Sequence, residues 1–222
     1  MARKSIAVIG LGQFGLAIVK ELAESGMDVI AIDKDPLVVK TIADIVPTCF
    51  VADSTDNNAL QELKIKDANT AIVAIGENSQ ASVITTVLLK ELGVKNVIAR
   101  ADNDYFVPIL KKLGADEVIT PQIAAGTALA RRLKNADYKD YYQLDDKHSV
   151  VSLKVNEKFE QKTLTQLNAK NVYGVNLVLI HRGKKAFVPG GSDSLLPDDT
   201  VFIVGTTKEI SVFSEAINGK AK

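Results

Sequence analysis

Three glycines near the amino terminus have the spacing that points most directly to chemistry. Gly10, Gly12 and Gly15 form a GxGxxG pattern between an apolar run and a segment of helical periodicity. Glycines at this spacing allow a tight turn, close approach of the backbone to a pyrophosphate, and close packing of helix on strand. The positive end of the helix then attracts the phosphates. The turn, which also contains Gln13 and Phe14, therefore predicts a nucleotide site, although a glycine turn can serve packing alone.

An acidic residue at the end of the second apolar run strengthens this prediction. Asp33 follows Gly15 by 18 residues, where a carboxylate accepts hydrogen bonds from ribose hydroxyls. Ligands of such folds lie beyond the carboxyl ends of the strands, which adds the candidates Lys34, Asp53, Ser54, Ala74, Ile75, Gly76, Glu77 and Arg100. Three of these have alternatives: Asp53 and Ser54 fit an adenine edge or the cap of a helix near Asn57, and Arg100 fits a phosphate partner or a surface residue. Lys34 and the following Asp35 also read as turn residues.

The elements that would position these residues are short β-rich runs alternating with helix-period segments. The runs are nearly continuous apolar stretches, as in parallel strands covered on both faces. Gly26, Gly93 and Gly114 stand where helices should end, and Asp35-Pro36 reads as a helix start. The sequence predicts a doubly wound parallel sheet of Rossmann type, in the order 3-2-1-4-5-6. Its strands are Ile6–Ile9, Asp28–Ile32, Thr48–Val51, Ala71–Ile75, Asn96–Ala99 and Glu117–Ile119.

The pattern changes after Pro121. We predict a nucleotide-binding domain over 1–134, a linker over 135–145 and a smaller α+β lobe over 146–222 that favours dimerisation. In that lobe we expect strands at Val150–Val155, Val175–His181, Ala186–Val188 and Thr200–Val204. We also expect helices at Thr163–Leu167 and at Lys208–Ile217, the second capped by Thr207.

Composition excludes several classes of function. The 222 residues hold 27 Lys and Arg against 27 Asp and Glu, so no net charge attracts nucleic acid. One cysteine, Cys49, cannot form an internal disulfide, and with two histidines it does not provide an ordinary His/Cys metal site. No apolar stretch is long enough to span a bilayer and the first residues do not resemble a signal peptide, so we expect a cytoplasmic protein.

A catalytic role finds little support in the side chains. His148 and His181 fall in the second lobe, outside the predicted cofactor cleft, and no Tyr-x-x-x-Lys pair occurs. Tyr138, Tyr141 and Tyr142 are better interpreted as packing at a hinge. Two alternatives to a nucleotide sensor stay open: a small oxidoreductase, which Asp33 would make NAD-dependent, and a partner-binding module that nucleotide merely stabilises.

Five stretches of the first domain together resemble a known family. They are Ala7–Gly15, Asp53–Asp56, Val73–Asn78, Leu88–Gly93 and Leu113–Asp116. As a set they resemble the RCK domain (regulator of conductance of potassium) of Ktr- and Trk-type potassium uptake systems. Tyr173–Asn176 and Pro197–Gly205 are similar to that family's carboxy-terminal lobe, so the resemblance covers nearly the whole chain.

The resemblance implies a non-enzymatic regulatory subunit in the cytoplasm. Such subunits form dimers and rings, often of eight chains, beneath a separate potassium-translocating membrane protein. ATP, ADP, NAD or NADH in the first domain would set the shape of the ring and so gate the pore.

Two departures from the family bear on the choice of nucleotide. Gln13 stands where relatives commonly carry an Arg for the terminal phosphate, and Gln122 where they carry a Glu that helps to hold a cation. Both favour a more even competition of ADP, NAD or NADH with ATP. Some relatives also bind cyclic di-AMP in the second lobe, at positions matched by Leu164, Lys170, Asn176 and His181. Each of these four also has an ordinary structural interpretation.

Overall fold

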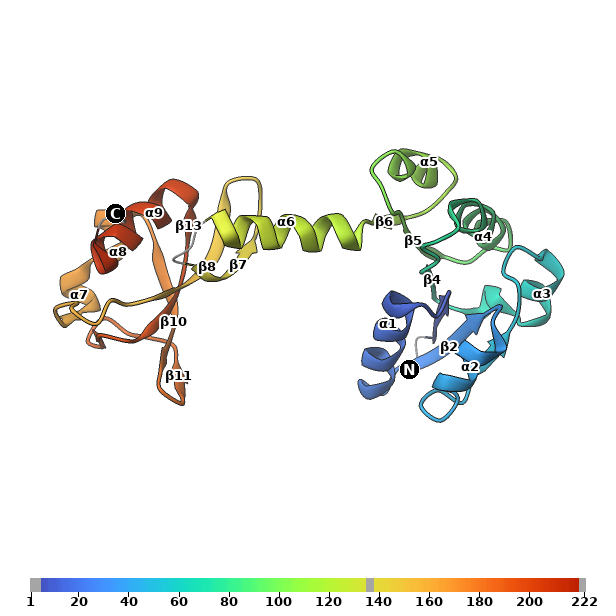
Figure 1. The fold of residues 1–222 in the computed structure, drawn as a ribbon, viewed down its shortest axis with the longest axis horizontal. Helices are drawn as coiled ribbons and strands as arrows, with labels where there is room; N and C mark the ends of the chain where they lie inside the picture. The colour runs from blue at the N-terminus through green and yellow to red at the C-terminus, as the bar shows by residue number, and fades with distance from the viewer. Residues whose placement is uncertain (1–4, 135–137, 220–222) are drawn as a thin grey trace. The chain divides into compact units, whose positions relative to one another are not determined.

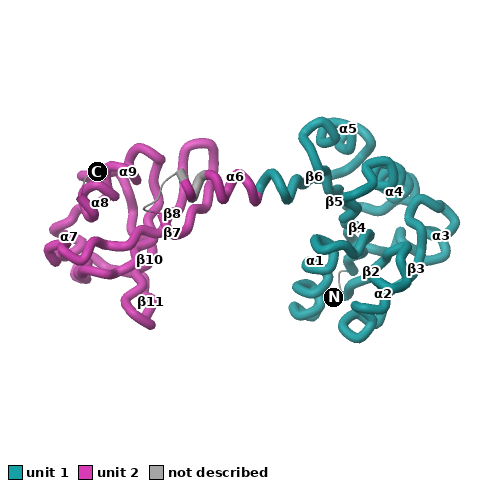
Figure 2. Tube along the Cα trace, viewed as in Figure 1, with its two compact units in different colours: residues 1–124 teal, residues 125–222 magenta. Residues whose placement is uncertain are grey.

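The computed structural model describes residues 5–134 and 138–219, which form two compact units, 1–124 and 125–222 (Figure 2). The division falls within helix α6 (Pro121–Lys134), earlier than the predicted boundary at 134. The predicted linker over 135–145 is contradicted at 138–143, because Tyr138–Gln143 form strand β7. Its residues 135–137 lie outside the described part. The strand forms there because β7 pairs with its neighbour and buries Tyr138 in the second core.

Unit 1 contains a six-stranded parallel sheet, as predicted. The order β3-β2-β1-β4-β5-β6 is the expected one, and every neighbouring pair is parallel. The strand order reverses direction between β1 and β4, and doubly wound folds bind ligands at this point, beyond the carboxyl ends of the strands. The strands are β1 (Ser5–Ile9), β2 (Asp28–Asp33), β3 (Cys49–Val51), β4 (Thr70–Val73), β5 (Asn96–Arg100) and β6 (Glu117–Ile119).

Helices cover both faces of this sheet (Figure 1). Val8 and Ile72 pack with α1 (Gln13–Glu24) and α2 (Pro36–Ile42), whereas the alternate residues Ala7 and Ile9 belong to the opposite core. That opposite core of unit 1 includes residues of α3 (Asn57–Glu62), η1 (Ile65–Asp67), α4 (Ser79–Glu91) and α5 (Phe106–Lys112). Burial on both faces explains why the strand sequences are apolar throughout.

The predicted helix boundaries of unit 1 are confirmed. Gly26, Gly93 and Gly114 follow helices with φ of 71°, 87° and 104°, a region that favours glycine. The Asp35 side chain caps α2 by accepting from the Leu37 amide at 2.8 Å, and proline follows at the first helical position.

Unit 2 is the predicted α+β lobe. Its five-stranded antiparallel sheet has the order β11-β10-β13-β8-β7, and the helices pack their apolar residues against it. The elements are β8 (His148–Lys154), β9 (Lys162–Thr163), α7 (Leu164–Leu167), α8 (Ala169–Tyr173), β10 (Asn176–Arg182), β11 (Lys185–Phe187), β12 (Ser194–Leu195), β13 (Thr200–Thr206) and α9 (Thr207–Asn218).

Three local features of unit 2 differ from the sequence predictions. The cap of α9 is Thr206, not Thr207, because the residue three positions beyond Thr206 is Glu209, which completes a capping box. The five-residue helix α8 was not predicted, and neither was the β9–β12 pair. Across the described part of the chain, no helix combines the length and the apolarity needed to cross a membrane.

Candidate functional site

The glycine turn lies between the end of β1 and the start of α1, and each of its three glycines has a different constraint. Gly10 has φ of 91°, and a Cβ there would approach the Ile75 amide nitrogen to 3.0 Å. A Cβ on Gly15 would collide with the Gly10 carbonyl oxygen. A Cβ on Gly12 would meet nothing within 4 Å. Gly10 and Gly15 are therefore required by packing, whereas Gly12 borders open space where a ligand can approach the backbone.

Helix α1 begins in that open space without a side-chain cap. Gly12 occupies the N-cap position, and no side chain bonds the amides of the first turn. The first amides of a helix have no intrahelical acceptor, and they lie at the positive end of the helix dipole. The uncapped start is therefore suited to an anion such as a phosphate.

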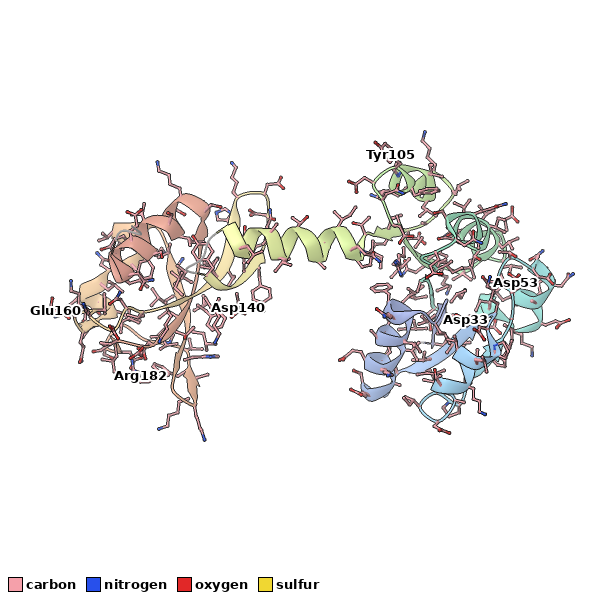
Figure 3. The ribbon with its side chains drawn as sticks, viewed as in Figure 1. Asp33, Asp53, Tyr105, Asp140, Glu160 and Arg182 are labelled. Atoms are coloured by element: carbon pink, nitrogen blue, oxygen red, sulfur yellow. The ribbon has the colours of Figure 1, made fainter. Side chains whose placement is uncertain are left out.

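Asp33, labelled in Figure 3, lies at the end of β2. Its carboxylate braces the glycine turn. One carboxylate oxygen accepts from the Leu11 amide at 2.6 Å, and the other accepts from the Asp35 amide at 2.9 Å. Each oxygen keeps a second lone pair, so the carboxylate can still accept from a sugar hydroxyl. Asp33 thus fixes the glycine turn and keeps acceptor capacity on both carboxylate oxygens.

Asp53 and Ser54, after β3, differ in their availability. Asp53 is exposed, and hydrogen bonds from the Thr55 hydroxyl and amide lower the pKa of its carboxyl, with a smaller contribution from the charge of the exposed Lys34. Ser54 is buried, with its hydroxyl 2.8 Å from that of Thr85 in α4. The Ser54 hydroxyl therefore has a partner within the fold, and its contact with a nucleotide stays a prediction. The helix near Asn57 is capped by Asp56, so neither candidate residue is its cap.

The residues after β4 form the floor of the site. Ala74 bonds the Ile9 carbonyl through its amide at 2.7 Å, and Ile75 packs against Gly10. Gly76 lies under the guanidinium of Arg100, from β5, which also lies 5.6 Å from the centroid of the Phe14 ring. Glu77 is exposed beyond them. The structure thus brings Phe14, Gly76 and Arg100 together beside the glycine turn.

Sequence reasoning missed Asp102, which pairs with Arg100 at 2.9 Å. The only signal in the sequence was an acid three residues beyond the predicted end of a strand. A cavity of about 10 Å³ adjoins this pair, with room for about one water and none for a nucleotide. A nucleotide would therefore have to lie in the open space above the turn.

The four candidate residues of the second lobe are spread over three elements. Leu164 in α7 is half-buried against the second core, and Lys170 in α8 is exposed. Asn176 and His181 are exposed on β10. A bulge between Leu177 and Leu179 lets Leu177 and Ile180 both face the core, so these two polar residues point away from it.

The remaining chemical side chains have structural partners. The His148 ring contacts the Asp145 carboxylate at 2.9 Å on the surface, and His181 lies 5.1 Å from the Phe202 ring. Tyr138 stacks on Tyr141 within β7. Within 5–134 and 138–219, acids, His and Cys do not gather into any group of three that could hold a metal ion.

Comparisons with known proteins match both units. A model of the TrkA-N domain matches residues 6–121, and one of the TrkA-C domain matches residues 149–218. The Ktr system potassium uptake protein C of Bacillus subtilis (strain 168) is 38% identical over 216 residues, covering 97% of this chain and 98% of the relative. The Ktr system potassium uptake protein A of Vibrio alginolyticus is 34% identical, covering 94% and 95%.

Among solved structures, the GsuK channel bound to NAD resembles the whole chain. The TM-score is 0.66 at 15% identity, and the match covers 100% of this chain but only 40% of the channel. At this identity the likeness establishes the fold alone.

Proposed function

Because the chain belongs to the TrkA family of nucleotide-binding potassium-transport regulators, we propose that it is a regulatory subunit that gates a separate potassium-translocating membrane protein. The family consists of regulators, not enzymes, so the oxidoreductase alternative does not hold. The observation that carries the proposal is the uncapped start of α1, open to a ligand at Gly12 and braced by Asp33. We place the protein in the cytoplasm, at the membrane only through its partner.

In the proposed site, backbone amides of the glycine turn hold the phosphates. Asp33 accepts from the ribose, and Asp53 with Lys34 borders the adenine. Ala74, Ile75, Gly76 and Glu77 form the wall on the β4 side, and Arg100 supplies a cation. Bound nucleotide would supply negative charge to unpaired amides, and it changes function only if it binds two conformations with different affinity.

We propose that ADP, NAD or NADH competes more evenly with ATP here than the charged residues of relatives would allow. Two observations support this: the GsuK channel of the comparison binds NAD, and neutral Gln13 and Gln122 stand where charged residues would favour a terminal phosphate and a cation. Calorimetric titration of the full chain would test it. Binding of ATP at least tenfold tighter than the others, and dependent on a divalent cation, would contradict it.

The assembly we propose is a dimer that forms a ring, of eight chains by resemblance to the family. A ring couples the site to the pore if nucleotide changes its shape, and sedimentation with and without ADP or ATP measures both its size and its shape. Rubidium flux into vesicles that hold a Ktr-type membrane subunit, with and without this chain, tests regulation directly. Rubidium flux that is the same with and without this chain and the nucleotide would refute the proposal. A ring whose shape does not change on nucleotide binding would favour a nucleotide that only stabilises the protein.

A second ligand, cyclic di-AMP, is proposed for unit 2. Lys170, Asn176 and His181 are exposed there, and Leu164 offers a half-buried apolar edge. Radiolabelled cyclic di-AMP should bind the full chain, and Lys170→Ala with Asn176→Ala should weaken it at least tenfold, about 1.4 kcal/mol. Equal binding by this double variant would remove the site from these residues.

A further inference from the structure

Arg100 is fixed in the candidate nucleotide site by two contacts that leave its charge near the glycine turn. Its guanidinium lies 5.6 Å from the centroid of the Phe14 ring, the second residue of α1. On the other side it lies so close to Gly76 that a Cβ there would be 2.6 Å from the guanidinium carbon. The absence of a side chain at Gly76 is therefore what allows the cation to lie on the backbone beside the start of α1.

Asp102 offsets this charge. Nη2 of Arg100 donates to Oδ1 of Asp102 at 2.9 Å, and the side chains are 13% and 35% exposed. The buried Nε of Arg100 has no hydrogen-bond acceptor among the described residues. A guanidinium has five N–H donors in a planar fork, so a single carboxylate contact leaves most of its capacity unused.

We infer that Asp102 competes with ligand phosphate for Arg100, and so sets how steeply affinity rises with the number of phosphates. The inference rests on the proposed nucleotide site. While the pair is closed, an incoming phosphate meets a neutral pair instead of a cation, and it must share or displace the carboxylate. A partly exposed ion pair is weak, whereas a guanidinium binds phosphate through two parallel hydrogen bonds, so the exchange is accessible.

Neighbouring charges do not substitute for Asp102 in this role. Lys34 and Glu77 are exposed at the ends of other strands. Asp104 carries the same charge in the same loop, but the structure shows no ion pair for it among the described residues. Asp104→Asn is therefore a matched control for Asp102→Asn, because both remove one exposed negative charge and only one frees Arg100.

The test is calorimetric titration of the full chain with adenosine, AMP, ADP and ATP. Asp102→Asn should bind ADP and ATP about two- to fivefold more tightly than the parent, the range that an exposed ion pair can account for, and adenosine with unchanged affinity. Asp102→Glu should restore the parent values, and Asp104→Asn should change them less. In an Arg100→Gln background, Asp102→Asn should add nothing, since the effect acts through the guanidinium.

Two results would overturn the inference. The first is an equal gain in Asp104→Asn, which would indicate general charge repulsion. The second is weaker phosphate binding in Asp102→Asn, which would mean that Asp102 positions Arg100 for the ligand. Asp102→Ala repeats the test should the Asn variant not fold. Failure of the parent chain to bind any of the four compounds would instead refute the proposed nucleotide site.

Discussion

The starts of α1 and α9, one in each unit, differ in whether side chains bond the first backbone amides of the helix. Between β1 and α1, the N-cap is Gly12 and no side chain bonds the helix amides. Between β13 and α9, Thr206 accepts from the Glu209 amide while the Glu209 carboxylate accepts from the Thr206 amide at 2.8 Å. Unit 2 thus satisfies its own helix end, whereas unit 1 leaves donors free. The difference is consistent with the proposed binding of a phosphate at the start of α1.

Two Arg–Asp pairs among the described residues show the same contrast. Arg182, labelled in Figure 3, donates to Asp199 through Nε at 2.9 Å and through Nη2 at 2.8 Å. The Asp199 carboxylate also accepts from the Leu196 amide. Asp199 is 1% exposed. Arg100 and Asp102 share a single hydrogen bond near the surface. The first pair is suited to stability and the second to exchange.

Breaking the pair of unit 2 should have the largest effect. Arg182→Met leaves the Asp199 carboxylate buried without its cation, and we expect a loss of about 3 kcal/mol in the free energy of unfolding. Four of the five tyrosines lie in 125–222, so tyrosine fluorescence during urea unfolding follows mainly this unit. Lys154→Met, which breaks the exposed pair with Asp198, is the control and should cost less than about 1 kcal/mol. Equal losses in both variants would show that the burial of Asp199 is unimportant.

Giving α1 a side-chain cap, which α9 has and α1 lacks, should weaken nucleotide binding at the turn without unfolding the protein. Gly12→Asp supplies an acceptor and a negative charge in open space, so we expect stability within about 1 kcal/mol of the parent. Nucleotide affinity should fall at least tenfold, about 1.4 kcal/mol, because the carboxylate occupies and repels the phosphate position. Thermal melting with and without ADP measures both quantities. Undiminished stabilisation by ADP would mean that phosphates do not bind at this helix end.

Removing the cap of α9 tests the other side of the comparison. Thr206→Ala eliminates the capping box, and we expect a loss of about 1 kcal/mol in the stability of unit 2. Nucleotide affinity in unit 1 should not change, which titration with ADP would check. Thr207→Ala is the matched control, since the neighbouring threonine does not cap the helix. A greater loss from Thr207→Ala would contradict the assignment of the cap.

Features set by local sequence rules were predictable, and features set by partners distant in sequence were not. The glycine turn follows from the spacing of its glycines, and the strand order follows from the alternation of strand and helix segments. Asp35-Pro36 by itself predicts the start of a helix. The polar segment of β7 gave no strand signal, because an edge strand that buries few side chains needs little apolar sequence. Thr206 was identifiable in principle, since Glu209 completes the capping-box spacing that Thr207 lacks.

Several roles within the site could not be predicted at all. The bond from the Leu11 amide to Asp33 and the burial of Ser54 against Thr85 depend on how separate strands and helices meet. The close approach of Arg100 to Gly76 depends likewise on the spacing of β4 and β5. Single residues at strand ends carry no periodic pattern, so their partners appear only once the sheet is assembled.

The smallest effect is expected from Glu209→Gln, which removes the charge of the α9 cap and keeps its hydrogen-bond geometry. Hydrogen bonds from the Thr206 amide and hydroxyl lower the pKa of Glu209 below its ordinary value of 4.5. A carboxyl whose pKa is depressed by folding stabilises the protein above its unfolded pKa, and this contribution is lost as the pH falls through the folded value. Gln also completes a capping box, so at neutral pH Glu209→Gln should lose only the small contribution of the ionised carboxylate. It should flatten the decline in the urea midpoint of unit 2 as the pH falls below about 4.5.

Asp145, whose pKa the Lys147 and His148 amides lower to about 2, is present in both proteins and cancels from the difference. Parallel pH profiles would show that the ionisation of Glu209 is not linked to folding, and that the cap acts by hydrogen-bond geometry alone.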